Sequence, residues 1–252
     1  MLAIEPLVVR DPLRHCGGMS NQQQDTITDD TRDPGRWGMP DSDICSAAWR
    51  LMFEVSPELI ANHNVRSYLF ARELAAAKGL RADVDYDDEV VFLSCLLHDL
   101  GITEYGSGDQ RFEVDGADAA ARFLREHDIA DDRITRVWQS IALHTSLGLA
   151  DRFGAEQSVT FFGISLDIDG SEKGRLSAGF ADRVHTAWPR HDLGYGIAEL
   201  IAADAAANPM KAPPFTFPAH VHQLINGGSM TFFDVVDNAG WGDQPRRDGL
   251  SS

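Results

Sequence analysis

The sequence predicts an all-α domain, and three observations lead to this fold class. Apolar side chains recur at helical spacing along most of the chain, and no segment shows the apolar–polar alternation of a half-buried strand. Serine, aspartate, proline and glycine stand at the ends of these periodic segments, where helices commonly begin and end. The 252 residues, 43% of them hydrophobic, suffice for one substantial core. We therefore expect a single domain of seven or eight helices.

The two ends of the chain differ from its centre in composition. Residues 10–41 are rich in Gly, Pro, Asp, Thr, Gln and Asn and have few apolar anchors, so residues 1–42 are predicted to form a mobile arm. Residues 43–214 carry the helical patterns and form the predicted helical domain. Residues 215–252 follow a proline-rich stretch and are predicted to be an irregular extension that packs on or near the domain.

The first strongly marked helix begins at Ser56-Pro57-Glu58, where the serine can cap the helix and the proline suits its first position. The pattern that follows has helical spacing and places a histidine on the inward face: Leu59, His63, Arg66, Phe70 and Leu74. The next helix is expected from about Asp88 to Leu100. Gly101 can adopt the left-handed conformation that ends a helix, so the last turn would present the adjacent pair His98-Asp99.

Further helices are expected in the second half of the chain. Asp115 can cap an Ala-rich helix that ends near His127, and Asp131 can cap the helix after it. The inward stripe of that later helix ends in a histidine: Ile134, Val137, Trp138, Ile141 and His144. Three more helices are expected over residues 157–168, 193–207 and 221–225. In the first of these, Asp167 ends an otherwise apolar stripe.

Composition narrows the classes of partner. The formal net charge of −17 and the lack of a basic patch argue against nucleic acid and anionic lipid as partners. No window approaches the roughly 20 apolar residues of a membrane span, and the first residues lack the pattern of a secretory signal. We therefore expect a cytoplasmic protein with a small-molecule substrate and leave a homo-oligomer open. Three scattered cysteines are too few for a disulfide framework or a thiolate zinc site, so any metal would be held by nitrogen and oxygen.

Polar side chains at inward or terminal positions of four separate helices indicate a metal site. They are His63, the pair His98-Asp99, His144 and Asp167. Burying them costs free energy unless they meet one another or a cation, and imidazole and carboxylate together suit a divalent metal. Asp169 is a rival for Asp167, although it lies beside a glycine and could equally be a cap. For each histidine alone, a hydrogen-bonded core imidazole is the competing interpretation.

The order of these residues resembles that of the HD-domain metalloprotein superfamily, over about residues 43–214. Within it, the chain is most similar to the HD-type cyanamide hydratases. The stretches that carry the resemblance are Asn62-His63-Asn64-Val65-Arg66-Ser67-Tyr68, Cys95-Leu96-Leu97-His98-Asp99-Leu100-Gly101-Ile102-Thr103, Arg111-Phe112-Glu113-Val114, His144, Leu166-Asp167, Val184-His185 and Trp188-Pro189-Arg190. Phe161-Phe162-Gly163 and the residues before Asp43 and after Pro214 depart from the pattern of that group.

The resemblance implies an HD-type helical bundle that binds one divalent ion, zinc by preference, with iron or manganese as alternatives. It makes His63, His98, Asp99 and Asp167 the metal ligands. His144 would be an accessory ligand or a group that handles protons, so His144 and Asp99 are the predicted catalytic residues. Four further residues are candidates for the pocket wall: Arg66, Thr103, Phe112 and Glu113.

The activity that this resemblance implies is the addition of metal-activated water to a small nitrile-type compound. Cyanamide would give urea, and a nitrile would give an amide. An HD-type phosphohydrolase is the main alternative, but its usual aids are missing: Arg66 is the one basic residue near the proposed ligands, and Ile102 stands where helical HD nucleotidases often carry an acid. A di-iron oxygenase would need a histidine between His144 and Asp167, where the sequence has none. A non-catalytic HD domain that binds a metabolite or a protein is the third alternative.

Overall fold

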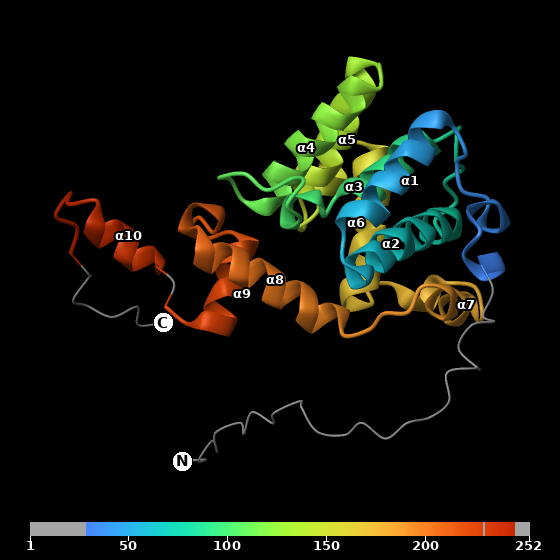
Figure 1. The fold of residues 1–252 in the computed structure, drawn as a ribbon. Coiled ribbons are helices and arrows are strands. Elements are labelled where there is room, and N and C mark those ends of the chain that lie inside the picture. Colours follow the sequence, from blue (N-terminus) through green and yellow to red (C-terminus); the bar gives the residue numbers. More distant parts are fainter. Residues whose placement is uncertain (1–28, 229, 245–252) are drawn as a thin grey trace, which may run out of the picture.

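The structure, a computed structural model, describes residues 29–228 and 230–244 and is all-helical over this part of the chain. Ten α-helices and six short 3-10 helices account for its regular structure, and the one β-bridge there joins Ala82 to Tyr86. The predicted fold class is therefore confirmed, with more helices than the sequence patterns indicated (Figure 1). None of the described helices is both long and apolar enough to cross a bilayer.

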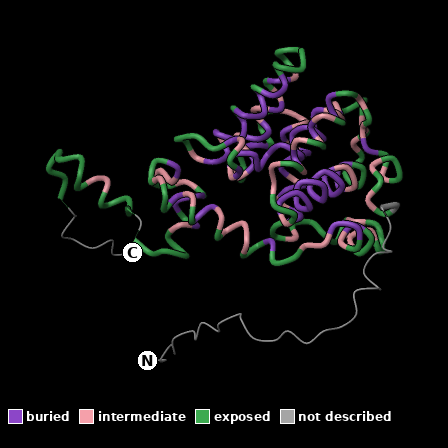
Figure 2. Tube along the Cα trace, viewed as in Figure 1, coloured by how far each residue is buried: buried purple, intermediate pink, exposed green. Residues whose placement is uncertain are grey.

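Four helices form the centre of the molecule, and two more flank them. The central helices are α2 (Glu58–Ala77), α3 (Asp88–Leu97), α5 (Asp131–Leu143) and α6 (Ala155–Asp169). The flanking helices are α1 (Asp43–Val55), which contacts α3, and α4 (Phe112–Glu126), which packs on α5. Helix α2 is buried along most of its length, including every residue from Ile60 to Ala71, as the purple trace in Figure 2 shows. Because this buried helix carries polar as well as apolar side chains, its polar side chains must find hydrogen-bond partners inside the protein.

Helices α2 and α6 approach each other closely because α6 has a glycine at the contact. A Cβ atom on Gly163 would overlap the carbonyl oxygen of Ser67 and lie 2.8 Å from the Cα of Ala71. Neither backbone can give way, so the small residue sets the separation of the two helices. This contact brings Asp167, one turn further along α6, beside α2.

The end of α3 differs from the prediction, and Gly101 has another role. Helix α3 ends at Leu97, His98 keeps a helical backbone, and Asp99 begins the short helix η3 (Leu100–Ile102). Gly101 lies inside η3 without a positive φ, so the predicted left-handed cap is wrong. Its missing Cβ instead leaves room for α4, since a Cβ there would overlap the carbonyl oxygen of Phe112. The chain bends between α3 and η3, and the adjacent His98 and Asp99 side chains both reach one point.

Several predicted caps are also placed differently. Helix α2 begins at Glu58 after Pro57, and Ser56 is the residue that ends α1. Helix α4 begins three residues before Asp115, whose carboxylate accepts hydrogen bonds from the backbone N–H groups of Gly108 and Gln110 and so fastens the preceding loop. Asp131 is the first residue of α5 rather than its cap, which is Ala130. Helix α6, by contrast, ends at Gly170 as predicted, and this glycine is left-handed with φ of 75°.

The C-terminal third adds four helices, of which one matches its predicted bounds. These are α7 (Phe180–Ala187), α8 (Leu193–Ala207), α9 (Phe217–Asn226) and α10 (Phe232–Asn238). Helix α8 has the predicted span, α9 is longer than predicted, and α1, α7 and α10 were not predicted. Helix α9 packs on α8 through buried Ala219 and Val221. Every residue of α10 is described and none is buried, and the helix lies apart from the bundle in Figure 1.

The predicted N-terminal arm is partly packed on the domain. Its first 28 residues lie outside the described part of the chain, as do residue 229 and residues 245–252 near the C-terminus. The short helices η1 (Asp29–Arg32) and η2 (Pro34–Trp37) follow. The ring of Trp37 lies 5.2 Å from that of Trp188 and 6.2 Å from that of Phe180, and Met39 is buried. Met39 therefore belongs to the core and Trp37 packs against it, so two apolar side chains anchor part of a segment whose composition predicted a mobile arm.

Candidate metal centre

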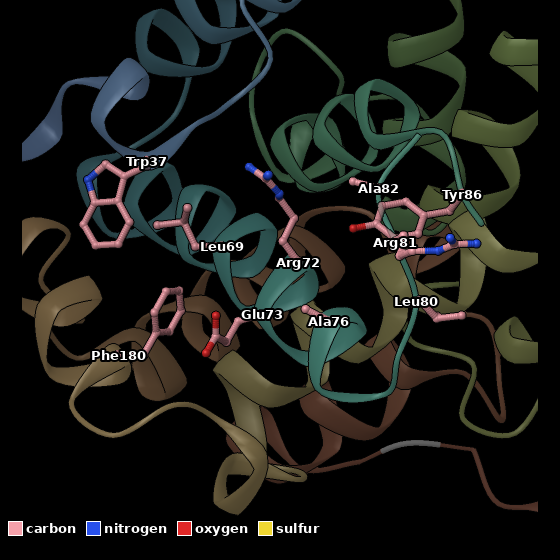
Figure 3. A pocket seen from close by; sticks show the side chains of 10 residues that line it. All are labelled: Trp37, Leu69, Arg72, Glu73, Ala76, Leu80, Arg81, Ala82, Tyr86 and Phe180. Atoms are coloured by element: carbon pink, nitrogen blue, oxygen red, sulfur yellow. The ribbon is translucent and has the colours of Figure 1, made fainter. Parts of the chain in front are cut away.

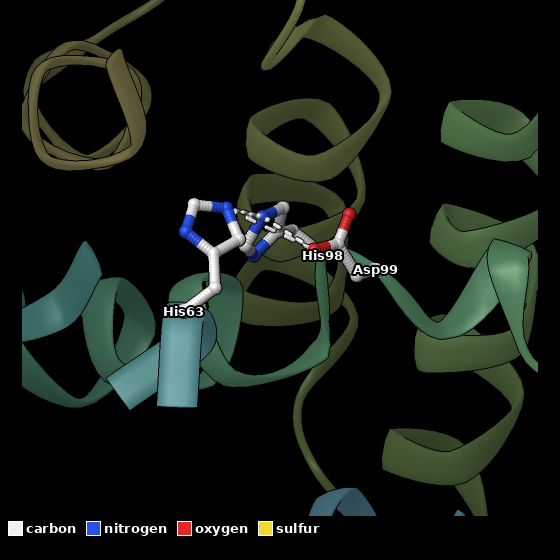
Figure 4. Close-up of side chains that lie close together, drawn as sticks. All are labelled: His63, His98 and Asp99. Atoms are coloured by element: carbon white, nitrogen blue, oxygen red, sulfur yellow. Dashed lines mark hydrogen bonds and ion pairs between the residues drawn. The ribbon is translucent and has the colours of Figure 1, made fainter. Parts of the chain in front are cut away.

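Three side chains from two segments of the chain converge inside the bundle. His63 projects from the second turn of α2, and His98 and Asp99 from the bend after α3, as Figure 4 shows. The Nε2 atoms of His63 and His98 are 3.2 Å apart. Asp99 Oδ2 lies 3.2 Å from His98 Nε2 and 3.8 Å from His63 Nε2. All three residues are at most 1% exposed. This buried cluster could hold a metal ion.

Hydrogen bonds fix which nitrogen of each imidazole faces the cluster. His98 Nδ1 lies 2.8 Å from the carbonyl oxygen of Cys95, so this nitrogen must carry the proton and donate it. His63 Nδ1 lies 2.7 Å from a carboxylate oxygen of Asp167, which likewise accepts. In neutral rings with protonated Nδ1, each Nε2 presents a lone pair. A carbonyl or carboxylate on the far nitrogen is the usual partner of a metal-bound histidine.

The facing atoms of the cluster are therefore acceptors, and they need a positive charge between them. Neither carboxylate oxygen of Asp99 has a hydrogen-bond partner among the described residues, although both are buried. A buried carboxylate without partners is costly. Four ligands about 2.0–2.1 Å from a tetrahedral zinc ion are about 3.4 Å apart, close to the separations of 3.2, 3.2 and 3.8 Å found here. The donor set thus fits a divalent cation; a proton on one imidazole is the alternative.

Burial and the charges within the cluster shift the pKa values of its three residues in different directions. Burial alone would raise the pKa of Asp99, but His98 and then His63 outweigh it and lower this pKa to about 2. Burial lowers the pKa of His63 below its ordinary value. For His98, burial also lowers the pKa, but the adjacent Asp99 carboxylate outweighs it and the net shift is upward. Asp99 is therefore ionised at neutral pH, which leaves a negative charge at the centre of the cluster.

Asp167 lies next to the cluster, held by two arginines. Its Oδ1 accepts hydrogen bonds from Arg66 Nε at 2.9 Å and Arg190 Nη1 at 2.6 Å, and its Oδ2 accepts from Arg66 Nη2 at 2.8 Å and contacts His63 Nδ1. Burial raises its pKa, but His63 and Arg66 outweigh this and hold the pKa well below its usual range. Asp167 therefore contacts the Nδ1 side of His63, away from the cluster, and it is not one of the three convergent groups. Asp169 is exposed and accepts from the N–H of Ser171.

His144 stands at the end of α5 on the other side of His98. Its ring lies 4.9 Å from that of His98 and 5.5 Å from that of Phe112. Its Nδ1 lies 2.6 Å from the carbonyl oxygen of Ile141, so the proton sits there as well. Burial, with a further contribution from His98, lowers the pKa of His144 to about 4. A neutral imidazole, whose Nε2 has no hydrogen-bond partner among the described residues, thus stands next to the cluster.

A cavity of about 270 Å³ lies against the cluster, and His63, His98, Asp99 and His144 all line it. Its other walls are mostly apolar and come from α4, α6, α8 and the start of α9: Phe112, Phe161, Ile164, Ile168, Ile197, Ala198, Ile201 and Phe217. Polar groups are few: Thr145, Ser165 and Asp169. The bundle therefore combines a group of metal-ligand side chains with space for a small molecule.

The four predicted wall residues are placed differently from one another. Phe112 lines the cavity, whereas Arg66 lies behind Asp167. Thr103 is buried and donates to the carbonyl oxygen of Leu100, so it stabilises η3. Glu113 is buried, forms an ion pair with Arg111, and accepts a hydrogen bond of 2.6 Å from Thr145. Thr145 lines the cavity, so its hydrogen bond connects Glu113 to the cavity wall.

The sequence patterns did not single out two contributors to this region. Arg190 was noted only within a stretch that resembles the hydratases, yet its guanidinium binds Asp167. Helix α8 was predicted as an Ala- and Ile-rich helix, but its Ile197, Ala198 and Ile201 form one wall of the cavity. A signal for α8 was present, since these positions follow helical spacing. This spacing did not reveal that the three side chains would face the cavity.

A second hollow, of about 440 Å³, lies along the opposite end of α2 (Figure 3). Trp37 forms part of its wall, and two arginines border it. Arg72 is paired with Asp88 at 3.6 Å, and Arg81 with Asp85 at 3.0 Å. Because these charges already have partners in the protein, the hollow does not resemble the His63 cavity chemically.

Comparisons with known proteins add no family assignment. No protein-family model matches the chain, and no curated protein matches it significantly. The class of protein that the fold and the cluster define is thus an all-helical chain with a buried His-Asp group able to hold a metal ion.

Proposed function

We propose that the chain is an HD-type metal-dependent hydratase that adds water to a small nitrile-type compound. The observation that carries this proposal is the buried Asp99 carboxylate, unpartnered among the described residues and facing two imidazole lone pairs beside a cavity. The proposal also draws on the resemblance of the His63, His98-Asp99 and His144 segments to HD-type cyanamide hydratases. His63, His98 and Asp99 are the proposed ligands, and zinc is the proposed ion.

Asp167 has a different proposed role from the one that the resemblance implies. Both of its oxygens are engaged by Arg66, Arg190 and His63 Nδ1. A carboxylate so occupied is better placed to orient His63 and raise the basicity of its Nε2 than to bind the ion itself. We therefore treat Asp167 as a positioning residue.

His63, His98 and Asp99 would hold the divalent ion, which would supply a nucleophile at neutral pH by lowering the pKa of a bound water to about 7. In nitrile hydration, the water oxygen bonds to carbon, one carbon–nitrogen π bond breaks towards nitrogen, and water protons end on nitrogen to give the amide. His144 is placed to serve this transfer, because its Nδ1 donates to Ile141, no hydrogen bond to its Nε2 is formed by the described residues, and it lines the cavity. It would take a proton from water and return one to the substrate nitrogen.

The cavity supports hydration rather than phosphoester hydrolysis. No Lys or Arg side chain is among the described residues that line it, so a phosphate would find no cationic partner there besides the ion. Arg66, the basic residue that the sequence placed near the ligands, is already paired with Asp167. The net charge of −17 adds long-range repulsion for an anionic substrate.

Metal analysis tests the site directly. The purified chain, loaded with zinc and dialysed, should retain about one ion per chain by plasma mass spectrometry, and His98→Ala should retain almost none. His127→Ala is the matched control, because His127 is exposed at the end of α4 and should leave the content unchanged. Equal metal contents in the wild type and His98→Ala would reject the site.

Activity on cyanamide, acetonitrile and benzonitrile then tests the reaction. We expect urea or amide from the zinc-loaded chain. His144→Ala should keep the metal and lose about 10²–10⁴-fold in kcat, the usual contribution of a positioned acid or base. Stoichiometric metal without urea or amide from any of these compounds would reject the hydratase and leave the metal site intact.

A further inference from the structure

The cavity beside the cluster is lined by polar side chains, here called its polar end, and by apolar side chains, here called its apolar end, and the two groups meet where the Phe112 ring lies 5.5 Å from that of His144. His63, His98, Asp99 and His144 form the polar end. Phe112, Phe161, Ile164 and Ile201 are at most 8% exposed and form the interior apolar wall: their side chains come from α4, α6 and α8. A substrate whose reacting group meets the cluster must therefore place the rest of itself against apolar side chains.

The size of the cavity exceeds what a very small substrate needs. Its volume of about 270 Å³ lies just below the range of roughly 300–1,000 Å³ typical of small-molecule sites. Cyanamide has three non-hydrogen atoms and would leave most of the apolar wall in contact with water. A molecule of about eight to ten non-hydrogen atoms would cover that wall and gain the free energy of apolar burial.

The charges around the cavity disfavour an anionic occupant. The lining includes two carboxylates, Asp99 at the polar end and exposed Asp169 at the rim, and its described residues include no Lys or Arg. The nearest guanidinium groups, those of Arg66 and Arg190, both bind Asp167. An anionic substituent would therefore lose its hydration without gaining a cationic partner.

We infer that the site selects a neutral nitrile with an aromatic or branched aliphatic substituent, and disfavours both cyanamide-sized and anionic compounds. This inference rests on the proposed function for the identity of the reacting group. The nitrile would face the cluster, and the substituent would pack between Phe112, Ile164 and Ile201.

Calorimetric titration of the zinc-loaded full chain with three probes tests this selectivity by binding. Benzonitrile is neutral and apolar, 4-cyanobenzoate carries a charge on the same ring, and cyanamide lacks the ring. We expect benzonitrile to bind at least tenfold more tightly than either of the others. Equal or tighter binding of 4-cyanobenzoate or cyanamide would overturn the inference.

A pair of substitutions on α8 locates the apolar end. Ala198 is half-buried on the cavity wall, so Ala198→Trp should fill the space and weaken benzonitrile binding at least tenfold while the metal content stays unchanged. Ala206→Trp is the matched control, because Ala206 is exposed on the same helix and is not part of the wall. Unchanged benzonitrile binding in Ala198→Trp would place the ligand elsewhere and overturn the inference.

The two proposals fail in distinguishable ways. If benzonitrile binds selectively but yields no benzamide, the selectivity of the site is supported and hydration is rejected. If cyanamide or acetonitrile is hydrated while benzonitrile neither binds nor reacts, the hydratase stands and the inferred substrate class is wrong.

Discussion

At the scale of single residues, the site depends on which nitrogen of each of three histidine rings is already hydrogen-bonded. Carbonyl or carboxylate oxygens take up Nδ1 of His63, His98 and His144. Each Nε2 is thereby left to face the cluster or the cavity. The Asp99 carboxylate, which has no hydrogen-bond partner among the described residues, adds a negative charge, so this cluster could hold a metal ion.

Substitution of Asp167 tests its role behind His63. Asp167→Asn should weaken zinc or cobalt affinity about 10–100-fold, because a neutral amide orients the imidazole less firmly and leaves Arg66 without its charge partner. Cobalt titration followed by visible absorption measures the affinity. The spectrum of the bound cobalt should keep its nitrogen and oxygen ligand set.

Asp169→Asn is the control for this experiment. Asp169 is exposed, two residues further along, and should leave affinity within about twofold of wild type. A larger loss from Asp169→Asn than from Asp167→Asn would show that the rival aspartate holds the ion. Thermal unfolding of both variants separates a loss of affinity from a loss of folded protein.

Sequence patterns could predict the residue types at the cluster but not all of its contacts. His63, His98 and Asp99 were predicted from inward positions and from a bend after an apolar run, both of which are local signals. The three contacts of Asp167 join residues 104, 101 and 23 positions away, namely His63, Arg66 and Arg190. Such pairings depend on how α2, α6 and the segment before α8 pack, which no local pattern specifies.

At the scale of elements, α2 connects the parts of the site. It carries His63 and Arg66, contacts α6 through the gap at Gly163, and lies buried among its neighbours. The position of α6 relative to α2 decides whether Asp167 reaches His63. The geometry of the cluster is therefore coupled to helix packing some distance from it.

Substitution of Gly163 tests this coupling. In an exposed helix, Gly→Ala would stabilise by about 1 kcal/mol. Here the new Cβ would overlap the backbone of α2, and we expect Gly163→Ala to lower the free energy of unfolding by about 1–3 kcal/mol and to weaken metal affinity. Urea denaturation measures the first effect and cobalt titration the second.

Gly174→Ala is the matched control on the short helix η5 (Lys173–Arg175). A Cβ there would meet no described atom within 4 Å, so stability should change by less than about 0.5 kcal/mol. A neutral or stabilising Gly163→Ala would contradict the close α2–α6 contact.

The centres of the helices were easier to predict than their ends. Periodic apolar stripes predicted α2, α5 and α6, and a composition rich in Ala and Ile predicted α8. The caps at Ser56 and Asp115 were wrong, since a capping side chain can equally end a previous helix or fasten a loop. Gly101 was assigned a left-handed backbone, but contact with α4 is what requires it to lack a Cβ.

At the scale of the whole molecule, the charge and the core act on different classes of ligand. A net charge of −17 attracts cations and repels anions over a Debye length, and leaves neutral compounds unaffected. The main core contains most of the apolar side chains of α1 to α7, including two free cysteines, Cys45 and Cys95. Those two thiols therefore report on the integrity of the fold.

Alkylation of these thiols tests the core. Burial raises the pKa of Cys45 to about 12 and that of Cys95 still further above its ordinary value, so both stay protonated and shielded in the folded chain. In a Cys16→Ser variant, iodoacetamide should modify neither thiol at pH 8 and only slowly at pH 10, and both at once in denaturant. Mass spectrometry of the native protein showing rapid modification at pH 8 would contradict the described packing of α1 and α3.

The fixed Nδ1 atoms also bear on how fast an ion is captured. Rings held by hydrogen bonds at one nitrogen cannot swing freely, so His63 and His98 already point at one place and little side-chain entropy is lost on association. For an ion bound by this cluster, we therefore expect the slow step to be the loss of water from the incoming ion rather than rearrangement of the protein. Association rates for different divalent ions should accordingly rank by their rates of water exchange.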